Sequence, residues 1–293
     1  YTTLFRSVNF MKKKITSILL ICLLIFGTVG IGFCDGKNLS RKEVEKIIEE
    51  IATKRGIPSV ILKSIAKIES SFNQFNRNGK PLTSRGGHIG IMQISGSSRS
   101  YDLEKLKNDP VYNIEAGANH LLGKWKMANE KMAQIGNMDP NILEHWYFAL
   151  WGYNGLLDRN NPNVSNRTYQ DRVYEIALKD YGQKITPISK KSIPNRGWPG
   201  RNTKIATPKD YHEGDILKYS PNDKVKIDGK SFLVLYDKPK GNKIGEVKGN
   251  VTMTIIEGPV LNDGFYFYKI SVDGDSKTGW VYGNWIYKIE SAE

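Results

Sequence analysis

One glutamate stands where a catalytic acid could work. Glu69 lies in the stretch IAKIESSFNQF and directly follows Ile68, the last of four apolar residues spaced as one helix face. The four are Val60, Ile61, Ile65 and Ile68. A carboxylate at the edge of a buried face loses hydration, which favours its neutral form and raises its pKa. A lone helix glutamate is more often solvated, so the interpretation of Glu69 as a general acid depends on its neighbours.

Three further segments of the same half carry small and polar residues. Glycine-rich SRGGHIGIMQ, residues 84–93, suits a backbone that approaches a sugar chain closely, and Gln93 offers both a donor and an acceptor. The other two segments are Asp109-Pro110 with NIEAG at 113–117, and ALWGYNG at 149–155.

The four segments, taken in order, resemble the catalytic domain of lytic transglycosylases, a goose-lysozyme-like family that cleaves peptidoglycan. The resemblance implies a mainly α-helical, lysozyme-like domain. It implies Glu69 as the catalytic residue and Ser70, Met92, Gln93, Tyr153 and Asn154 as substrate-binding residues. Tyr153 is expected to hydrogen-bond near the catalytic carboxyl, and Asn154 to hold an N-acetyl group. His88, Gly152 and the position of Gly155 depart from the family pattern.

The mechanism depends on whether a second carboxylate faces Glu69. Ordinary glycoside hydrolysis uses two carboxylates, whereas the resemblance implies one: Glu69 protonates the leaving oxygen and then deprotonates the C6 hydroxyl of N-acetylmuramic acid, closing a 1,6-anhydro ring. A hydrolysing N-acetylmuramidase with a second carboxylate stays open. So does a wall-binding protein without activity. The candidate second acids are Asp102, Asp109, Glu115, Glu144 and Asp158.

The sequence predicts neither a metal site nor a cofactor. His88, His120, His145 and His212 lack ligand spacing. Both cysteines, Cys22 and Cys34, lie near the amino terminus, so a chain that starts near Asp35 would hold no thiol for a disulfide, a metal or a nucleophile.

The first 34 residues have the layout of a secretory signal. Three lysines precede an apolar run from Ile15 to about Phe33, which ends among the small residues Gly30, Gly32 and Cys34. We interpret Met11 as the start of translation. Cleavage is favoured, with an uncleaved anchor and a lipid-modified Cys34 as alternatives, so we expect a secreted or cell-wall protein.

The charge favours an anionic partner. The formal net charge is +13, and it falls to +9 without residues 1–34, which hold Arg6 and three lysines but no acid. A basic secreted protein meets polyanions, and a wall with teichoic acids suits this charge. Because Lys and Arg form no long run, a solvated surface explains most of them. We expect peptidoglycan as partner, no nucleic acid, and a monomer.

The helical pattern of the sequence ends near residue 183. Residues 184–210 hold four prolines and little apolar periodicity, which is typical of a linker. About five short strands then follow, rich in Val, Ile, Tyr and Phe. Residues 231–289, with FYFYKI and KTGWV, resemble a bacterial SH3-like domain, which implies wall binding through teichoic acids or peptide stems. Trp280 and Val281 are expected in its core.

The sequence thus predicts an α+β multidomain protein. The expected parts are a leader at 1–34, a lysozyme-like transglycosylase domain at 35–183, a basic Pro-rich linker at 184–222 and a small all-β SH3-like barrel at 223–293.

Overall fold

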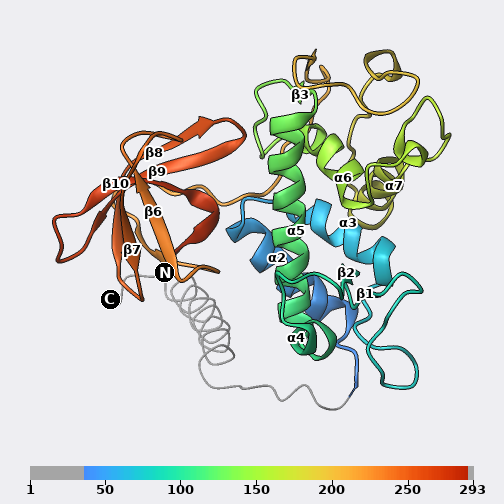
Figure 1. Ribbon diagram of the computed structural model, residues 1–293, viewed down its shortest axis with the longest axis horizontal. Helices are drawn as coiled ribbons and strands as arrows, with labels where there is room; N and C mark the ends of the chain where they lie inside the picture. Colours follow the sequence, from blue (N-terminus) through green and yellow to red (C-terminus); the bar gives the residue numbers. More distant parts are fainter. Residues whose placement is uncertain (1–35, 290–293) are drawn as a thin grey trace, which may run out of the picture. The chain divides into compact units, whose positions relative to one another are not determined.

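The computed structural model describes residues 36–289, and the chain from Gly36 onward forms one compact unit (Figure 1). The expected leader, with both cysteines, lies outside the described residues, so its cleavage stays a prediction. Within 36–289, no helix has both the length and the apolar character needed to cross a bilayer.

The first part of this unit is helical, as the sequence predicts (Figure 1). Its α-helices are α2 (Arg41–Lys54), α3 (Ser59–Ser70), α4 (Leu103–Asn108), α5 (Pro110–Lys131), α6 (Tyr147–Tyr153) and α7 (Tyr169–Tyr181). Contacts join α5 to α2, α4 and α6, and α3 to α2 and α7. Stacked Trp125 and Trp146, with ring centroids 4.3 Å apart, lie in the shared core.

Side-chain caps explain where these helices begin. Ser40 and Glu43, spaced three residues apart in the sequence, form a capping box at α2, and Asp109 accepts from the Tyr112 amide at α5, with Pro110 in the first turn. Two details differ from the helical pattern of the sequence. That pattern predicts one helix over Asn141–Trp151, whereas the structure has a 3₁₀ turn, η1 (Leu143–Trp146), followed by α6, and it does not predict α4, which Asp102 caps.

Two small pairings complete the helical part. Strands β1 (His88–Ile89) and β2 (Ile94–Ser95) form an antiparallel pair in the glycine-rich segment. Strand β3 (Gln134–Ile135) pairs in parallel with β4 (Lys204–Ile205), which belongs to the segment expected as a linker.

The segment 184–222 packs on the helical part instead of running free of it, which differs from the flexible linker that its composition indicates. Ile185, Ile188, Ile193 and Ile205 are buried in the helical core. Asp215 accepts a 2.7 Å hydrogen bond from the Ser59 amide and so caps α3, the helix that carries Glu69. Isolated isoleucines between prolines have no period, and for this reason the pattern did not reveal their burial.

The last part is a seven-stranded sheet that curls into a half-barrel (Figure 1). Its strands are β5 (Lys224–Ile227), β6 (Phe232–Tyr236), β7 (Lys243–Lys248), β8 (Met253–Asn262), β9 (Phe265–Val272), β10 (Thr278–Tyr282) and β11 (Ile286–Lys288). The order is β11-β5-β8-β9-β10-β6-β7, and every pairing is antiparallel. Trp280 and Val281 are buried, as predicted.

Buried polar contacts join the sheet to the helices. Trp125 of α5 donates a 2.8 Å hydrogen bond from Nε1 to the Gly264 carbonyl. Arg55, which follows α2 and is 2 % exposed, forms a 2.8 Å ion pair with Asp228. Because such groups are costly to leave unpaired, these contacts hold the sheet against α2 and α5.

Candidate active site

Glu69 lies in the last turn of α3, partly buried, where the helix ends abruptly. Ser71 and Phe72 both have left-handed backbones, with φ of 55° and 68°. A bulky residue such as Phe72 adopts this conformation only at a cost of about 1–3 kcal/mol, and such strain gathers at functional sites. Phe72 is nevertheless buried, so its packing holds the turn that follows Glu69.

The pKa of Glu69 is raised above its ordinary value. Burial is the main cause, because it penalises the charged carboxylate. Three groups oppose it: a hydrogen bond from Tyr169 and the positive potentials of Arg172 and His88. The desolvation expected from the helix pattern is therefore present and outweighs the groups that favour ionisation.

Tyr169 is the direct partner of the Glu69 carboxyl. Its hydroxyl donates a 2.7 Å hydrogen bond to Glu69 Oε1. Tyr169 is the first residue of α7, and the capping box of Thr168 and Asp171 fixes the start of that helix. Burial raises the pKa of Tyr169 well above its ordinary value, so the hydroxyl stays neutral and remains a donor.

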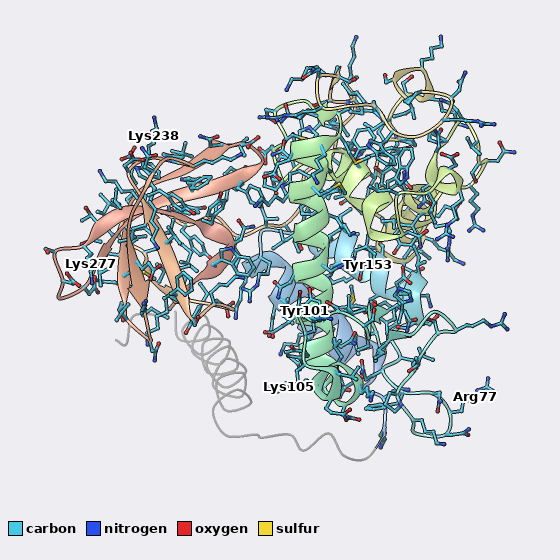
Figure 2. All side chains as sticks on the ribbon, viewed as in Figure 1. Arg77, Tyr101, Lys105, Tyr153, Lys238 and Lys277 are labelled. Atoms are coloured by element: carbon cyan, nitrogen blue, oxygen red, sulfur yellow. The ribbon has the colours of Figure 1, made fainter. Side chains whose placement is uncertain are left out.

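Tyr153 contacts Tyr169 and makes no hydrogen bond to Glu69 among the described residues. Its hydroxyl donates to the Met92 carbonyl at 2.8 Å, and its ring stacks on Tyr169 with centroids 6.4 Å apart. The expected hydrogen bond near the carboxyl is thus made by Tyr169, while Tyr153 joins Tyr169 to the glycine-rich loop. Tyr153 and Tyr101 both lie beside α5 (Figure 2).

Two buried amides anchor the glycine-rich loop. Asn113 of α5 accepts from the Met92 amide at 2.9 Å and donates to the Ile89 carbonyl at 3.0 Å, and Gln74 accepts from the Ile91 amide at 3.2 Å. A Cβ on Gly90, whose φ is +73°, would come within 2.4 Å of both amide side chains, so this position requires glycine.

The conformation of the glycine-rich loop decides where three of the predicted substrate-binding residues lie. Gln93, with a left-handed φ of 48°, lines the cavity at Glu69. The Met92 side chain is fully buried against Gly117, so Met92 cannot contact a substrate through that side chain. Ser70 donates at 2.8 Å to the Ile91 carbonyl and is not among the cavity residues, so its role is to hold the loop against α3.

Asn154 ends α6 and lines the same cavity. Its Oδ1 accepts hydrogen bonds from Arg159 Nη2 at 3.2 Å and from Asn160 Nδ2 at 3.3 Å. The Nδ2 group of Asn154 makes no hydrogen bond to a described residue, so it is the donor that this orientation offers to an N-acetyl carbonyl.

The cavity has a volume of about 440 Å³ and, among the described residues that line it, contains one acid, Glu69. Apart from Ile94, the remaining lining residues are polar, aromatic or basic: Ser84, His88, Gln93, Ser95, His120, Tyr153, Asn154 and Arg159. Burial lowers the pKa of His120 to about 4, so this imidazole is neutral near pH 7. The cavity therefore combines one protonatable carboxyl with several hydrogen-bonding groups.

None of the five candidate second acids lines the cavity at Glu69. Asp102 and Asp109 cap α4 and α5. Asp158 accepts from the Gly197 amide, and the fully buried Glu144 accepts from the Thr186 and His212 amides. Glu115 lines a different cavity. Residues 36–289 also hold no group of three or more His, Cys, Asp or Glu side chains that could bind a metal ion.

A comparison with known protein families agrees with this arrangement. Residues 46–174 match the family model of the transglycosylase SLT domain. The SLT match spans every residue of the cavity and supports lytic transglycosylase activity on peptidoglycan in general terms. The comparisons with curated proteins and with solved structures gave no match.

Sequence reasoning missed four residues of the SLT region that act around Glu69. Tyr169 and Arg172 lie on α7, about 100 positions further along the chain, and Arg159 and His120 lie outside the four segments. The capping box before Tyr169 was a visible signal for the helix start. A capping box does not predict, however, which residue of another helix Tyr169 contacts.

Proposed function

We propose that this protein is a secreted peptidoglycan lytic transglycosylase that cleaves the β-1,4 bond between N-acetylmuramic acid and N-acetylglucosamine and leaves 1,6-anhydro ends. The observation that carries the proposal is the cavity around Glu69, in which one desolvated carboxyl has no second acid among the described lining residues. The match of residues 46–174 to the SLT domain supports the substrate class.

Glu69 acts twice in the proposed mechanism. Burial raises its pKa and so favours the protonated carboxyl, whose proton passes to the glycosidic oxygen as the bond from C1 to that oxygen breaks. The resulting carboxylate accepts the proton of the C6 hydroxyl as O6 bonds to C1. No water is consumed, and Glu69 ends in its starting protonation state.

Neighbouring groups support both steps. The Tyr169 hydroxyl donates to Glu69 Oε1, so it stabilises the carboxylate formed after the first proton transfer. Asn154, held by Arg159, and Gln93 supply hydrogen bonds for the N-acetyl and hydroxyl groups. These contacts would orient the sugar with respect to Glu69.

The half-barrel sheet is proposed to be an SH3-like domain that binds the wall. Its curled antiparallel sheet and its partly exposed aromatic residues support this assignment. Secretion rests on the leader pattern alone, and the protein is proposed to act as a monomer.

The test is mass spectrometry of the soluble muropeptides released from purified peptidoglycan. The protein should release anhydro-muramic ends, and Glu69→Gln should lower release by about 10²–10⁴-fold while still sedimenting with the wall. Glu104→Gln, which alters an exposed glutamate of α4 paired with Lys107, is the matched control and should cleave normally. Reducing muramic ends would instead establish a hydrolysing muramidase, and wall binding without release from any variant would establish a binding protein.

A further inference from the structure

A second and larger cavity lies between α5 and the half-barrel sheet. Its volume is about 690 Å³, and residues of both parts line it. Glu115, Asn119 and Lys126 come from α5, whereas Tyr236 and Tyr282 come from the sheet. His120, adjacent to Asn119 in sequence, lines the Glu69 cavity, so α5 separates the two sites.

Aromatic rings make up much of the wall of this second cavity. From the helical side come Tyr101 and Tyr112, and from the sheet side come Tyr236, Phe265, Tyr282 and Trp285. A further hollow of about 330 Å³ continues along the sheet and shares Lys230, Tyr236, Tyr282 and Trp285 with it. Rings exposed along two joined hollows suit an extended ligand with alternating apolar and polar groups.

Glu115 is the anionic group of this cavity. It makes no hydrogen bond or ion pair to a described residue, although burial raises its pKa. The surrounding charges are of both signs: Arg55 and Lys54 favour its ionisation, whereas Asp228 and Asp109 oppose it, and Arg55 is already paired with Asp228. A partly buried carboxylate without a partner favours a ligand that brings a cation.

Other polar groups add to this preference. The Oδ1 atom of Asn119, one turn beyond Glu115, is buried without a hydrogen-bond partner. At the edge, Lys126 and Lys230 are exposed, and the Lys230 ammonium lies 4.2 Å from the centre of the Trp285 ring. The cavity thus offers an acidic centre, aromatic walls and a basic rim, which complements a zwitterionic peptide.

We infer that this cavity binds a peptide stem of peptidoglycan, with a free side-chain amine of the stem against Glu115 and the stem carboxylates near Lys126 and Lys230. The site uses the SLT region and the sheet jointly, so neither part holds it alone. The identification of the ligand as a wall peptide rests on the proposed function. The preference for an amine rests on Glu115 and its surroundings.

Calorimetric titration with a synthetic stem peptide tests the inference. The peptide carries its diamino acid with a free side-chain amine, and the matched ligand has that amine acetylated. The free peptide should bind the protein, and acetylation should weaken binding by roughly tenfold or more, because it removes a charge-assisted hydrogen bond. Glu115→Gln should weaken binding of the free peptide to a similar extent, while Glu104→Gln should not change it.

Glu69→Gln separates the two proposals, since it should abolish cleavage and leave peptide affinity unchanged. Thermal melts of Glu115→Gln serve as the control for folding of this variant. Tyr236→Ala is a second variant, which should lose peptide affinity several-fold. Equal affinity for the free and acetylated peptides, or for Glu115→Gln and the parent protein, would overturn the inference. So would binding of a peptide-free glycan or a teichoic acid in place of the peptide.

Discussion

The Tyr169 hydroxyl donates a 2.7 Å hydrogen bond to Glu69 Oε1 across 100 positions of sequence. This bond lowers the pKa of a carboxyl whose burial raises it, so the two effects together set the proton affinity of the proposed catalytic acid. The cleavage rate should fall as pH rises through the pKa of Glu69, because the first step needs the protonated form.

Tyr169→Phe should move this alkaline limb to higher pH. The substitution removes a donor to the carboxylate and leaves the desolvation in place, so the pKa of Glu69 rises further. The measurement is the initial rate of muropeptide release as a function of pH. Tyr174→Phe is the control on the same helix, since its buried hydroxyl has no hydrogen-bond partner. A limb that stays in place or moves to lower pH in Tyr169→Phe would contradict this account.

Arg159 is expected to act through Asn154. Arg159→Ala and Asn154→Ala should each lower the initial rate of release by about tenfold, because each disturbs the amide that lines the cavity. The double variant should lose little more than the worse single variant, since the two residues share one contact. Arg167→Ala, which removes an exposed ion pair to Glu175, is the control. Losses that multiply in the double variant would show that Arg159 acts independently of Asn154.

Gly117 and Gly123 lie on the same helix, α5, and differ in the space available for a side chain. A Cβ on Gly117 would lie 2.4 Å from Met92 Cγ, whereas a Cβ on Gly123 would meet nothing within 4 Å. Gly117→Ala should therefore lower the free energy of unfolding by about 1–2 kcal/mol, while Gly123→Ala should raise it by about 0.5–1 kcal/mol through helix propensity. Urea unfolding measures both. Stabilisation by Gly117→Ala would mean that the loop at Met92 is not tightly packed.

Much of this architecture can be predicted from the sequence. The helical face that ends at Glu69, the caps at Ser40 and Asp109, and the alternation in the sheet all depend on local patterns. The partners of Glu69 cannot be predicted in this way, because Tyr169 and Arg172 reach it through tertiary packing of α7 against α3. Met92 shows the reverse case. Its place in the glycine-rich segment predicts a substrate contact, but its side chain is buried in the core.

The segment 184–222 illustrates the same limit of local patterns. Glu144 is fully buried and accepts hydrogen bonds from the amides of Thr186 and His212, so it joins two points of this segment to the helical part. Glu144→Ala should lower the free energy of unfolding by about 3 kcal/mol, because it leaves two partly buried amide donors without their acceptor. Glu104→Ala, at an exposed ion pair, should change it by less than about 0.5 kcal/mol.

Limited proteolysis tests the packing of this segment directly. Trypsin should cut the parent protein slowly at Lys190 and Lys191, because isoleucines on either side of these lysines are buried. In Glu144→Ala the same sites should be cut much faster. Rapid cleavage of the parent protein there would instead support the flexible linker that the composition indicates.

Cleavage in water labelled with heavy oxygen tests the central claim most directly. In the proposed mechanism the C6 hydroxyl closes on C1 and no water enters, so mass spectrometry should find anhydro-muramic ends that carry no heavy oxygen. Their formation should be lost in Glu69→Gln. Reducing muramic ends that carry the heavy oxygen at C1 would contradict the claim, because they would require an attacking water.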